Sequence, residues 1–302
     1  MQINRSDLAD CAYFIAIARH RSFRRAGLEL GVSSSALSHA LKAFETRLGL
    51  RLLNRTNRSV TLTAAGEQLL QAISDPVNVI GDAFETLNRF RDAPAGRIRI
   101  NMMADAAALL VSPILPVFME RYPDVELEIS VDNHIVDVID SGFDAGIRYG
   151  GTVPEDMIAQ RLSGEIDWVI VGAPSYFERF GRPQHPNDLA EHRCLRIRLG
   201  DDSIYKWELD KADESVAIDV PGMITVNNAD AALPAVLAGA GLTYLSEPLV
   251  RPLVAAGQLE IALPDWASTG PAFHLYYSSR RNVPTGLRLL VDLIRELRPL
   301  GY

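Results

Sequence analysis

Apolar residues recur at helical spacing between residues 34 and 48. They follow one another at steps of four, three and four positions: Leu37, Leu41, Phe44 and Leu48. Such steps put the four side chains on one face of an α-helix. Ser33 predicts the N-cap, because its hydroxyl can accept from a free backbone N–H, and Gly49 predicts the left-handed turn at the other end. The pattern therefore predicts an amphipathic helix.

The opposite face of this helix carries hydroxyl and cationic side chains before its first carboxylate, Glu45. They are Ser34, Ser35, Ser38, His39 and Lys42. Such a face can approach a polyanion closely and donate hydrogen bonds to phosphates and base edges. An ordinary solvated helix has a similar pattern, so the flanking residues must decide between the two interpretations.

The upstream flank predicts a helix-turn-helix. Residues 22–30 form a short helix with Ser22 as its cap, and Gly31 begins a tight turn into residues 34–48. Residues 6–20 predict a first helix that packs on this pair. The three segments together predict an all-α DNA-binding core.

The downstream flank predicts a basic hairpin. Residues 51–55 and 59–63 have the composition of two short strands around a turn at 56–58. A hairpin at this place is a wing, which can lay Arg55 and Arg58 along a DNA backbone or into a minor groove.

Here the sequence resembles the LysR-type transcriptional regulators. The resemblance rests on Ser22-Phe23, Ala26, Leu30, Val32-Ser33, Ala36-Leu37-Ser38, Glu45, Leu48-Gly49, Leu52, Arg55 and Leu62-Thr63-Ala64-Ala65-Gly66. It implies that the N-terminal domain binds double-stranded DNA in promoter regions. The expected contacts are Ser22, Ser33, Ser34, Ser35, Ser38, His39, Lys42, Arg55 and Arg58.

Two residues depart from the family pattern. Gly27 stands where the family usually has a second Ala, and a glycine in a helix should cost about 1 kcal/mol. His39 stands where the family often carries Arg, which alters the expected base preference but not DNA binding.

The sequence from Ala64 to about Phe90 predicts one long helix. One stripe of this helix has the spacing of a coiled-coil seam, with alternating steps of four and three residues: Leu69, Ile73, Pro76, Ile80, Ala83 and Leu87. Pro76 should kink or loosen it. The seam could pack on its own domain, but the resemblance implies a linker helix that pairs two subunits antiparallel, in a homodimer or homotetramer.

Strands and helices alternate from Arg97 onward, which predicts a two-lobed α/β domain with parallel sheets. The first lobe should contain a broken helix at 106–121, with Pro113 and Pro116 as its breaks, and a short helix at 135–141. The predicted domains are a winged helix-turn-helix at 1–63, a linker helix at 64–91, a hinge at 92–96 and an effector-binding domain at 97–302. Within the effector-binding domain, lobe I is predicted at 97–163 and 268–302, and lobe II at 164–267.

This second part resembles the family's effector-binding domain, which has the type 2 periplasmic-binding-protein fold. The matching residues are Pro116, Phe118, Tyr122-Pro123, Asp137, Gly142-Phe143-Asp144, Ile147-Arg148, Pro174, Tyr176, Gly239, Gly241-Leu242 and Arg280-Arg281. The resemblance therefore covers nearly the whole chain, and its more specific motifs lie in the N-terminal domain.

A ligand of such a domain should bind beyond the carboxyl ends of the strands. The expected contacts are Asn101, Met102, Met103, Ala104, Asp105, Asn133, Arg148, Arg198, Gly200, Asp201, Asn227, Asn228 and Ser246. Helix N–H groups together with Arg148 or Arg198 would suit an organic anion. Asp105 stands where Ser or Thr is common in the family and would repel a carboxylate, so the charge of the effector stays open.

Net charge divides the chain. Residues 1–63 carry +6, and because the whole chain carries −8, residues 64–302 carry −14. A basic N-terminal module can bind phosphate while the acidic remainder stays off the DNA. The resemblance also implies RNA polymerase as a partner if the protein activates transcription.

The remaining composition indicates a cytoplasmic protein without a membrane span. The two cysteines, Cys11 and Cys194, fall in different predicted domains and suggest neither a disulfide framework nor a metal site. We find no nucleophile or phosphate-binding motif and expect no catalytic residue, metal or cofactor besides the effector. The alternative is a solute-binding protein or enzyme on the same two-lobed fold, with an N-terminal dimerisation appendage.

Overall fold

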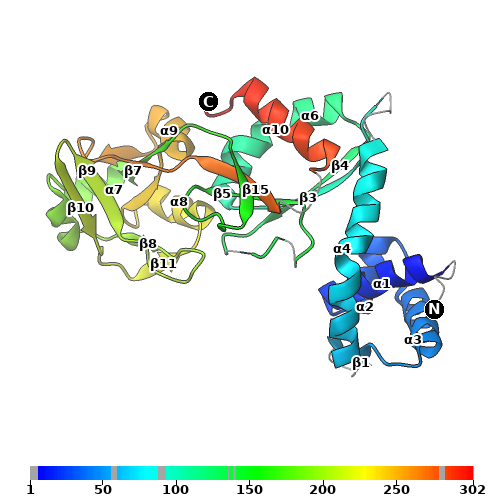
Figure 1. The fold of residues 1–302 in the computed structure, drawn as a ribbon. Coiled ribbons are helices and arrows are strands. Elements are labelled where there is room, and N and C mark those ends of the chain that lie inside the picture. The colour runs from blue at the N-terminus through cyan, green and yellow to red at the C-terminus, as the bar shows by residue number, and fades with distance from the viewer. Residues whose placement is uncertain are drawn as a thin grey trace. The chain divides into compact units, whose positions relative to one another are not determined.

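The computed structural model describes residues 6–55, 60–87, 93–134, 136–138, 141–278 and 283–301. The chain forms two compact units, the first built mainly from residues up to 92 and the second from most of residues 93–302. Figure 1 labels many of the elements of both.

The first unit is the predicted helix-turn-helix, formed by α1 (Asp7–His20), α2 (Phe23–Leu30) and α3 (Ser34–Leu48). Its core is apolar and includes Phe14, Ile17, Leu37, Leu41 and Phe44. The Ser22 and Ser33 hydroxyls accept from the backbone N–H groups of Arg25 and Ala36, at 3.3 and 3.1 Å. Gly31 and Gly49 end α2 and α3 with φ of 66° and 71°. The predicted caps are confirmed.

The turn between α2 and α3 is tight. The Val32 N–H donates to the Gly27 carbonyl at 3.0 Å, and a Cβ added at Gly27 would lie 2.6 Å from the Val32 carbonyl oxygen. Gly27 thus permits a close backbone approach, which offsets the helix-propensity cost expected from sequence.

The predicted wing strands are present as β1 (Leu53–Arg55) and β2 (Val60–Leu62), which pair antiparallel with Leu53 opposite Leu62. The predicted turn and Arg58 lie outside the described residues.

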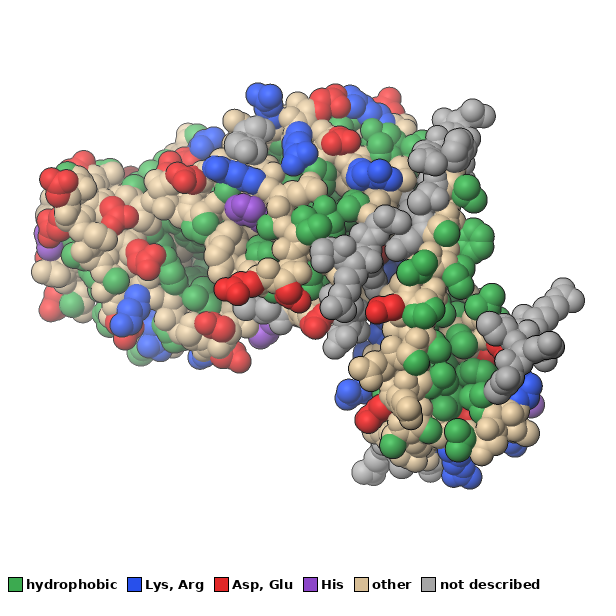
Figure 2. Space-filling model, in the orientation of Figure 1, with side chains coloured by type: hydrophobic (Ala, Val, Ile, Leu, Met, Phe, Trp, Pro, Cys, Tyr) green, Lys and Arg blue, Asp and Glu red, His purple; other side chains and the backbone are tan. Residues whose placement is uncertain are grey.

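The linker helix α4 (Ala64–Thr86) continues through Pro76 without a break. The sequence predicts that this helix extends to about residue 90, but residues 88–92 lie outside the described residues. Its predicted seam is divided. Leu69 and Ile73 pack on the core of their own unit, whereas Ile80 and Leu87 are exposed. The interpretation of one continuous intersubunit seam is therefore wrong for the first turns of α4. Figure 2 shows hydrophobic side chains gathered along this helix.

Lobe I of the second unit is built on a five-stranded sheet of order β4-β3-β5-β15-β6. Its strands are β3 (Gly96–Met102), β4 (Val125–Val131), β5 (Ala145–Tyr149), β6 (Met157–Arg161) and β15 (Phe273–Ser278). Strands β4, β3 and β5 run parallel, but β15 runs antiparallel to both β5 and β6. The expectation of an all-parallel sheet is wrong here, because the chain returns from the other lobe in the opposite direction.

A helical segment over residues 104–121 follows β3 and changes its winding three times. It consists of α5 (Ala104–Ala106), a π-helical turn (Ala107–Val111), a 3₁₀ turn (Ser112–Ile114) and α6 (Leu115–Arg121). Pro113 and Pro116 stand at the starts of the last two pieces, so each proline replaces a donor that the new turn would leave unpaired anyway. The prolines change the winding without ending the helix.

Helix α10 (Thr285–Leu297) lies beside α6 on one face of the lobe I sheet (Figure 1). The two helices are joined by Arg121, whose Nη1 lies 2.6 Å from Oε2 of Glu296. A Cβ added at Gly286 would meet Val125 at 2.9 Å, so α10 lies close on the sheet. The helix predicted at 135–141 is absent from its described part, since residues 136–138 and 141 are not helical.

Lobe II contains a sheet around β7 (Ile166–Gly172), which pairs antiparallel with β12 (Thr243–Ser246), β13 (Glu260–Ala262) and β14 (Ser268–Gly270). Its other elements are α7 (Pro174–Phe180), a 3₁₀ helix (Pro186–Glu191), β8 (Leu195–Ile197), β9 (Trp207–Lys211), β10 (Glu214–Ile218), β11 (Ile224–Val226), α8 (Ala229–Leu237) and α9 (Glu247–Ala255). The sequence predicts residues 268–270 in lobe I, but β14 pairs with β7 and belongs to the lobe II sheet.

Candidate functional site

The outer face of α3 presents the polar residues that the sequence singled out. Ser34, Ser35, His39 and Lys42 are exposed, and Ser38 is half-buried. Ser22 and Ser33 lie at the helix starts, where their hydroxyl oxygens are occupied by backbone N–H groups. Each hydroxyl proton can still be donated to an anion, because a serine hydroxyl donates and accepts at once.

Arg55 of the wing is held against the helix-turn-helix. Its Nη1 donates to the Ser38 Oγ at 3.0 Å, and its guanidinium lies 4.6 Å from the centroid of the Phe23 ring. Glu45 accepts from the N–H groups of Leu52 and Leu53 at 2.8 and 3.1 Å. These contacts fix β1 relative to α3.

Carboxylates on each of α1, α2 and α3 are engaged by cations. Arg47 joins Asp7 and Asp10 at 2.9 and 2.5 Å, and these hydrogen bonds raise the pKa of Arg47. Glu29 contacts Arg19 at 3.1 Å. Because these acids are paired with cations of their own, they do little to neutralise the outer face of α3.

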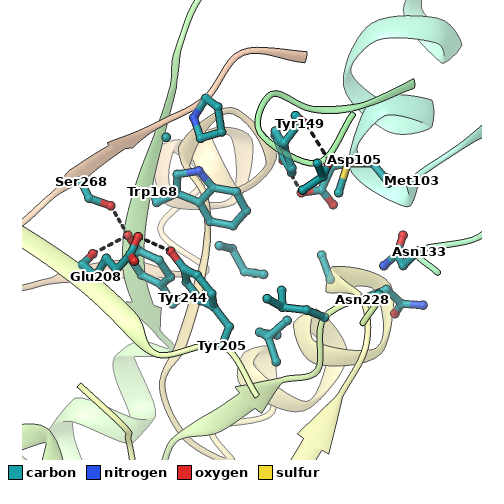
Figure 3. Close-up of a pocket in the computed structure, with 18 of the residues that line it drawn as sticks. Met103, Asp105, Asn133, Tyr149, Trp168, Tyr205, Glu208, Asn228, Tyr244 and Ser268 are labelled. Atoms are coloured by element: carbon teal, nitrogen blue, oxygen red, sulfur yellow. Dashed lines mark hydrogen bonds between the residues drawn. The ribbon is translucent and has the colours of Figure 1, made fainter. Parts of the chain in front are cut away.

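A cavity of about 310 Å³ lies between the two lobes of the second unit. Lobe I contributes Met103, Asp105, Asn133 and Tyr149, and lobe II contributes Trp168, residues 197–200, Tyr205, Glu208, residues 227–229, Tyr244 and Ser268. Figure 3 shows these side chains around the cavity, with Asp105 and Tyr149 on one side and Trp168, Tyr244 and Tyr205 on another. A cavity of this size is typical of small-molecule sites.

The predicted effector contacts divide into two groups. Those on the cavity wall are Met103, Asp105, Asn133, Arg198, Gly200, Asn227 and Asn228. Those placed elsewhere are Asn101, Met102, Ala104, Arg148, Asp201 and Ser246. Asn101, Met102 and Ser246 are buried behind the wall, and Asp201 is exposed at the surface, where it accepts from Ser203.

Arg148 is not a wall residue because its guanidinium is used inside the protein. It is 3% exposed, and it donates to the carbonyls of Ile147, Asp132 and His134 at 2.9, 3.0 and 3.0 Å, and to the Asn101 side chain. Burial lowers its pKa. The predicted contact between Arg148 and an effector is corrected to a structural role, holding the loop after β4 against the strand ends.

Asp105 sits in the first turn after β3, and Tyr149 donates to its Oδ2 at 2.8 Å. Burial raises the pKa of Asp105, and the hydrogen bond from Tyr149 opposes that rise. The neighbouring Ala104 N–H donates to the Asn133 Oδ1 at 3.0 Å. A protein side chain therefore already caps this helix start.

Aromatic side chains form a part of the wall that is absent from the predicted contacts. Trp168 lies in an edge-to-face contact with Tyr149 and stacks on Tyr244, with ring centroids 5.5 and 5.7 Å apart. Tyr205 stacks on Tyr244 at 6.1 Å. The strand-end rule names residues after parallel strands, whereas Trp168 lies within antiparallel β7.

Among the described residues, no helix is long and apolar enough to cross a membrane, and no cluster of three or more His, Cys, Asp or Glu could hold a metal ion. Cys194 is buried, and burial raises the pKa of its thiol to about 12. A thiol with that pKa is a poor nucleophile at neutral pH.

Comparison with known proteins connects both units to one family. The family model described as "LysR substrate binding domain" matches residues 91–299, and the one described as "Bacterial regulatory helix-turn-helix protein, lysR family" matches residues 8–67. The HTH-type transcriptional regulator YcaN of Escherichia coli K12 is 39% identical over 96% of this chain and 95% of its own. PgrR of the same strain is 33% identical over 97% of this chain and 98% of its own.

Solved structures agree with the sequence comparisons. AphB of Vibrio cholerae, a virulence activator, matches with a TM-score of 0.65 and 25% identity over 96% of this chain and 98% of its own. CrgA of Neisseria meningitidis matches with a TM-score of 0.61 and 26% identity over the full length of both chains. These relatives are regulators, which decides against the solute-binding and enzyme alternatives. The chain therefore belongs to the LysR-type transcriptional regulators, DNA-binding proteins whose second domain binds a small-molecule effector.

Proposed function

We propose that α3 enters the major groove of promoter DNA and that Ser34, Ser35, Ser38 and His39 contact base edges. The observation that carries this proposal is the outer face of α3, which exposes hydroxyl and cationic side chains while the neighbouring carboxylates are paired. Such side chains donate to the acceptors that bases and phosphates present in the major groove.

Lys42, Arg55 and Arg58 position the DNA backbone in this proposal. Lys42 is exposed on α3, and Arg55 is preorganised by its contacts with Ser38 and Phe23. A preorganised arginine loses little side-chain entropy when it meets a phosphate. Arg58 follows β1 in sequence and would extend the basic wing.

The proposed assembly is a homodimer through the exposed part of α4, and a homotetramer from two such dimers. A dimer carries two α3 helices, so its operator should be an interrupted near-palindrome with half-sites about one helical turn or a multiple apart. The protein would work in the cytoplasm, with RNA polymerase as a partner if it activates. It would need no cofactor besides its effector.

Effector binding in the interlobe cavity would shift a two-state equilibrium of lobe or subunit arrangement. Only an effector with different affinities for the two states can do this. The shift would change the spacing or bend of the DNA that the oligomer accepts.

Salt dependence of DNA binding tests the α3 interface. Lys42→Ala should weaken binding to specific and random duplexes alike and reduce the slope of log K against log salt by about one unit, because one phosphate contact is lost. Lys206→Ala, which removes an exposed cation from the second unit, should leave the slope unchanged. Equal slopes for wild type and folded Lys42→Ala would contradict the proposed contact.

Base preference tests the other half of the proposal. His39→Ala should change which duplexes are preferred in a selection from random sequence, because His39 is placed at base edges. The variant should keep its affinity for random DNA. Unchanged preference after this substitution would remove His39 from the base-reading residues.

A further inference from the structure

We infer that the interlobe cavity selects a small organic cation with an apolar or aromatic body. This inference rests on the proposed function and names the chemical class of its effector. It follows from three features of the cavity: its charges, its aromatic wall and the occupied state of its hydrogen-bond donors.

Acidic side chains outnumber basic ones on the wall. Asp105, Glu208 and Asp210 line the cavity, and Arg198 is the single cation among the described lining residues. The Arg198 Nη1 donates to the backbone carbonyl of Asp202 at 2.6 Å, so this group is bonded to its own loop. The wall therefore has a negative net charge.

Asp105 is the acid best placed for a ligand. The side chains that shift the pKa of Asp105 are Tyr149, Ser246 and the like-charged Asp230. None of these three is a cation. Asp105 is partly buried, and a carboxylate shielded from water without a counter-ion is costly, so desolvation raises its pKa. A cationic ligand would supply the missing counter-charge.

Tyr149, Trp168 and Tyr205 are partly exposed and give the wall the aromatic surface of a cation site, whereas Tyr244 is buried and stacks with Trp168 and Tyr205. Tyr149, Trp168, Tyr244 and Tyr205 follow one another with centroid separations of 5.5, 5.7 and 6.1 Å. A cation within about 6 Å of such ring faces is attracted by their quadrupoles, most strongly by tryptophan. Figure 3 shows the Trp168 ring between Asp105 on one side and Tyr244 and Tyr205 on the other.

The backbone N–H groups of Ala104 and Ala231, which a bound anion could use at two helix starts, are already bonded to protein side chains. The Ala104 N–H at the start of α5 bonds to Asn133, and the Ala231 N–H in the first turn of α8 bonds to the Asn228 Oδ1 at 2.9 Å. Arg148 does not line the cavity, and its two terminal guanidinium nitrogens donate to backbone carbonyls. An anionic ligand would have to meet Asp105 with few donors in compensation.

A set of matched probes tests the charge preference on the full-length protein. Isothermal titration would compare phenethylammonium, neutral 2-phenylethanol and anionic 3-phenylpropionate, which share a phenyl ring and a short chain. We expect the ammonium to bind at least about tenfold more tightly than the alcohol, because only the ammonium gains cation–π contacts and a counter-charge from Asp105. Tighter binding of the propionate, or no binding of the ammonium at millimolar concentration, would overturn the inference.

Substitutions assign the preference to this cavity. Asp105→Asn should remove most of the preference for the ammonium over the alcohol, and Trp168→Leu should reduce it. Asp213→Asn removes an exposed charge from lobe II away from the wall and should leave the preference intact. Thermal melts establish that each variant is folded. An unchanged ammonium-to-alcohol ratio in folded Asp105→Asn would show that Asp105 does not recognise the cation.

DNA binding separates this inference from the proposed function. If 3-phenylpropionate binds the cavity and alters DNA affinity, effector control stands and the cation inference fails. If phenethylammonium binds with the expected preference but leaves DNA affinity and footprint unchanged, the cation inference stands and the proposed switching by this cavity fails.

Discussion

Asn133 of lobe I donates a hydrogen bond from its Nδ2 to the backbone carbonyl of Asn227 in lobe II at 2.5 Å. Its Oδ1 accepts from the Ala104 N–H at 3.0 Å, so one side chain joins the first helix start of lobe I to the opposite lobe. Both residues line the cavity. The bond can form only when the lobes are close together, and it therefore stabilises the closed arrangement.

Replacing Asn133 with Ala should open the cavity. The loss of about 1 kcal/mol from one hydrogen bond should raise the apparent effector Kd about fivefold, since the closed state becomes less populated. Isothermal titration with the probe that binds wild type measures this change, and small-angle scattering measures the spread of the lobes. An unchanged Kd would mean that the bond does not contribute to closure.

Gly200 offers a second, steric test of the same contact between the lobes. A Cβ added there would lie 2.2 Å from the Asn133 carbonyl oxygen, a distance that forces the two loops apart. Gly200→Ala should weaken effector binding about tenfold or more, because overpacking of this kind costs about 1–3 kcal/mol. Each lobe should keep its own fold, as judged by far-UV circular dichroism. Wild-type affinity in this variant would show that the lobes need not approach so closely.

The sequence predicts the helix-turn-helix well because its signals are local. Ser22, Ser33, Gly31 and Gly49 act within a few residues of their own position, and the apolar stripe of α3 needs only a helix to define its face. The division of α4 is different. Its stripe is apolar along its whole length, and only tertiary packing decides that the side chains of its first turns are covered and those of its last turns exposed.

The cavity was harder to predict because it depends on contacts between distant segments. The strand-end rule correctly named Asp105, Asn133 and Asn228 as wall residues. It also named Arg148, whose partners are carbonyls that only the fold brings together. Trp168 was missed because the rule does not address antiparallel strands.

Asp105→Asn should stabilise the folded protein at neutral pH. The pKa of Asp105 is raised by burial, so the folded state binds its proton more tightly than the unfolded state. The stability that this proton provides is present at low pH and is lost as the pH rises through the folded-state pKa. The variant avoids this loss, and its higher Tm should converge with that of wild type below the ordinary pKa of 3.8.

Asp132→Asn is the control with the opposite sign. Hydrogen bonding to the His134 backbone lowers the pKa of Asp132, so its carboxylate stabilises the folded state above its ordinary pKa and this stability is lost as the pH falls. Asp132→Asn should therefore have a lower Tm at neutral pH. Thermal melts across this pH range distinguish the two, and a parallel response of both variants would contradict the assigned causes.

Glu45→Ala should destabilise the first unit by about 1–3 kcal/mol, because it leaves the N–H groups of Leu52 and Leu53 without their acceptor. Glu45→Gln keeps an oxygen for these donors and should cost less. Its loss of a negative charge beside Arg55 should also leave DNA affinity at or above the wild-type value. Urea unfolding and DNA titration measure both effects, and equal stability of the two variants would exclude the acceptor role.

A charge on the exposed part of α4 should dissociate the oligomer. Phe84 is 70% exposed and Ile80 40% exposed in the single chain, so both offer apolar surface to a partner helix. Phe84→Glu or Ile80→Glu would bury an unpaired carboxylate in that interface, which is costly enough to favour separate subunits. Gln71→Glu adds the same charge at an exposed polar position earlier in α4 and should leave the oligomer intact. Sedimentation equilibrium measures the outcome. If the variants at residues 80 and 84 remain as associated as wild type, subunits do not pair through this face of α4.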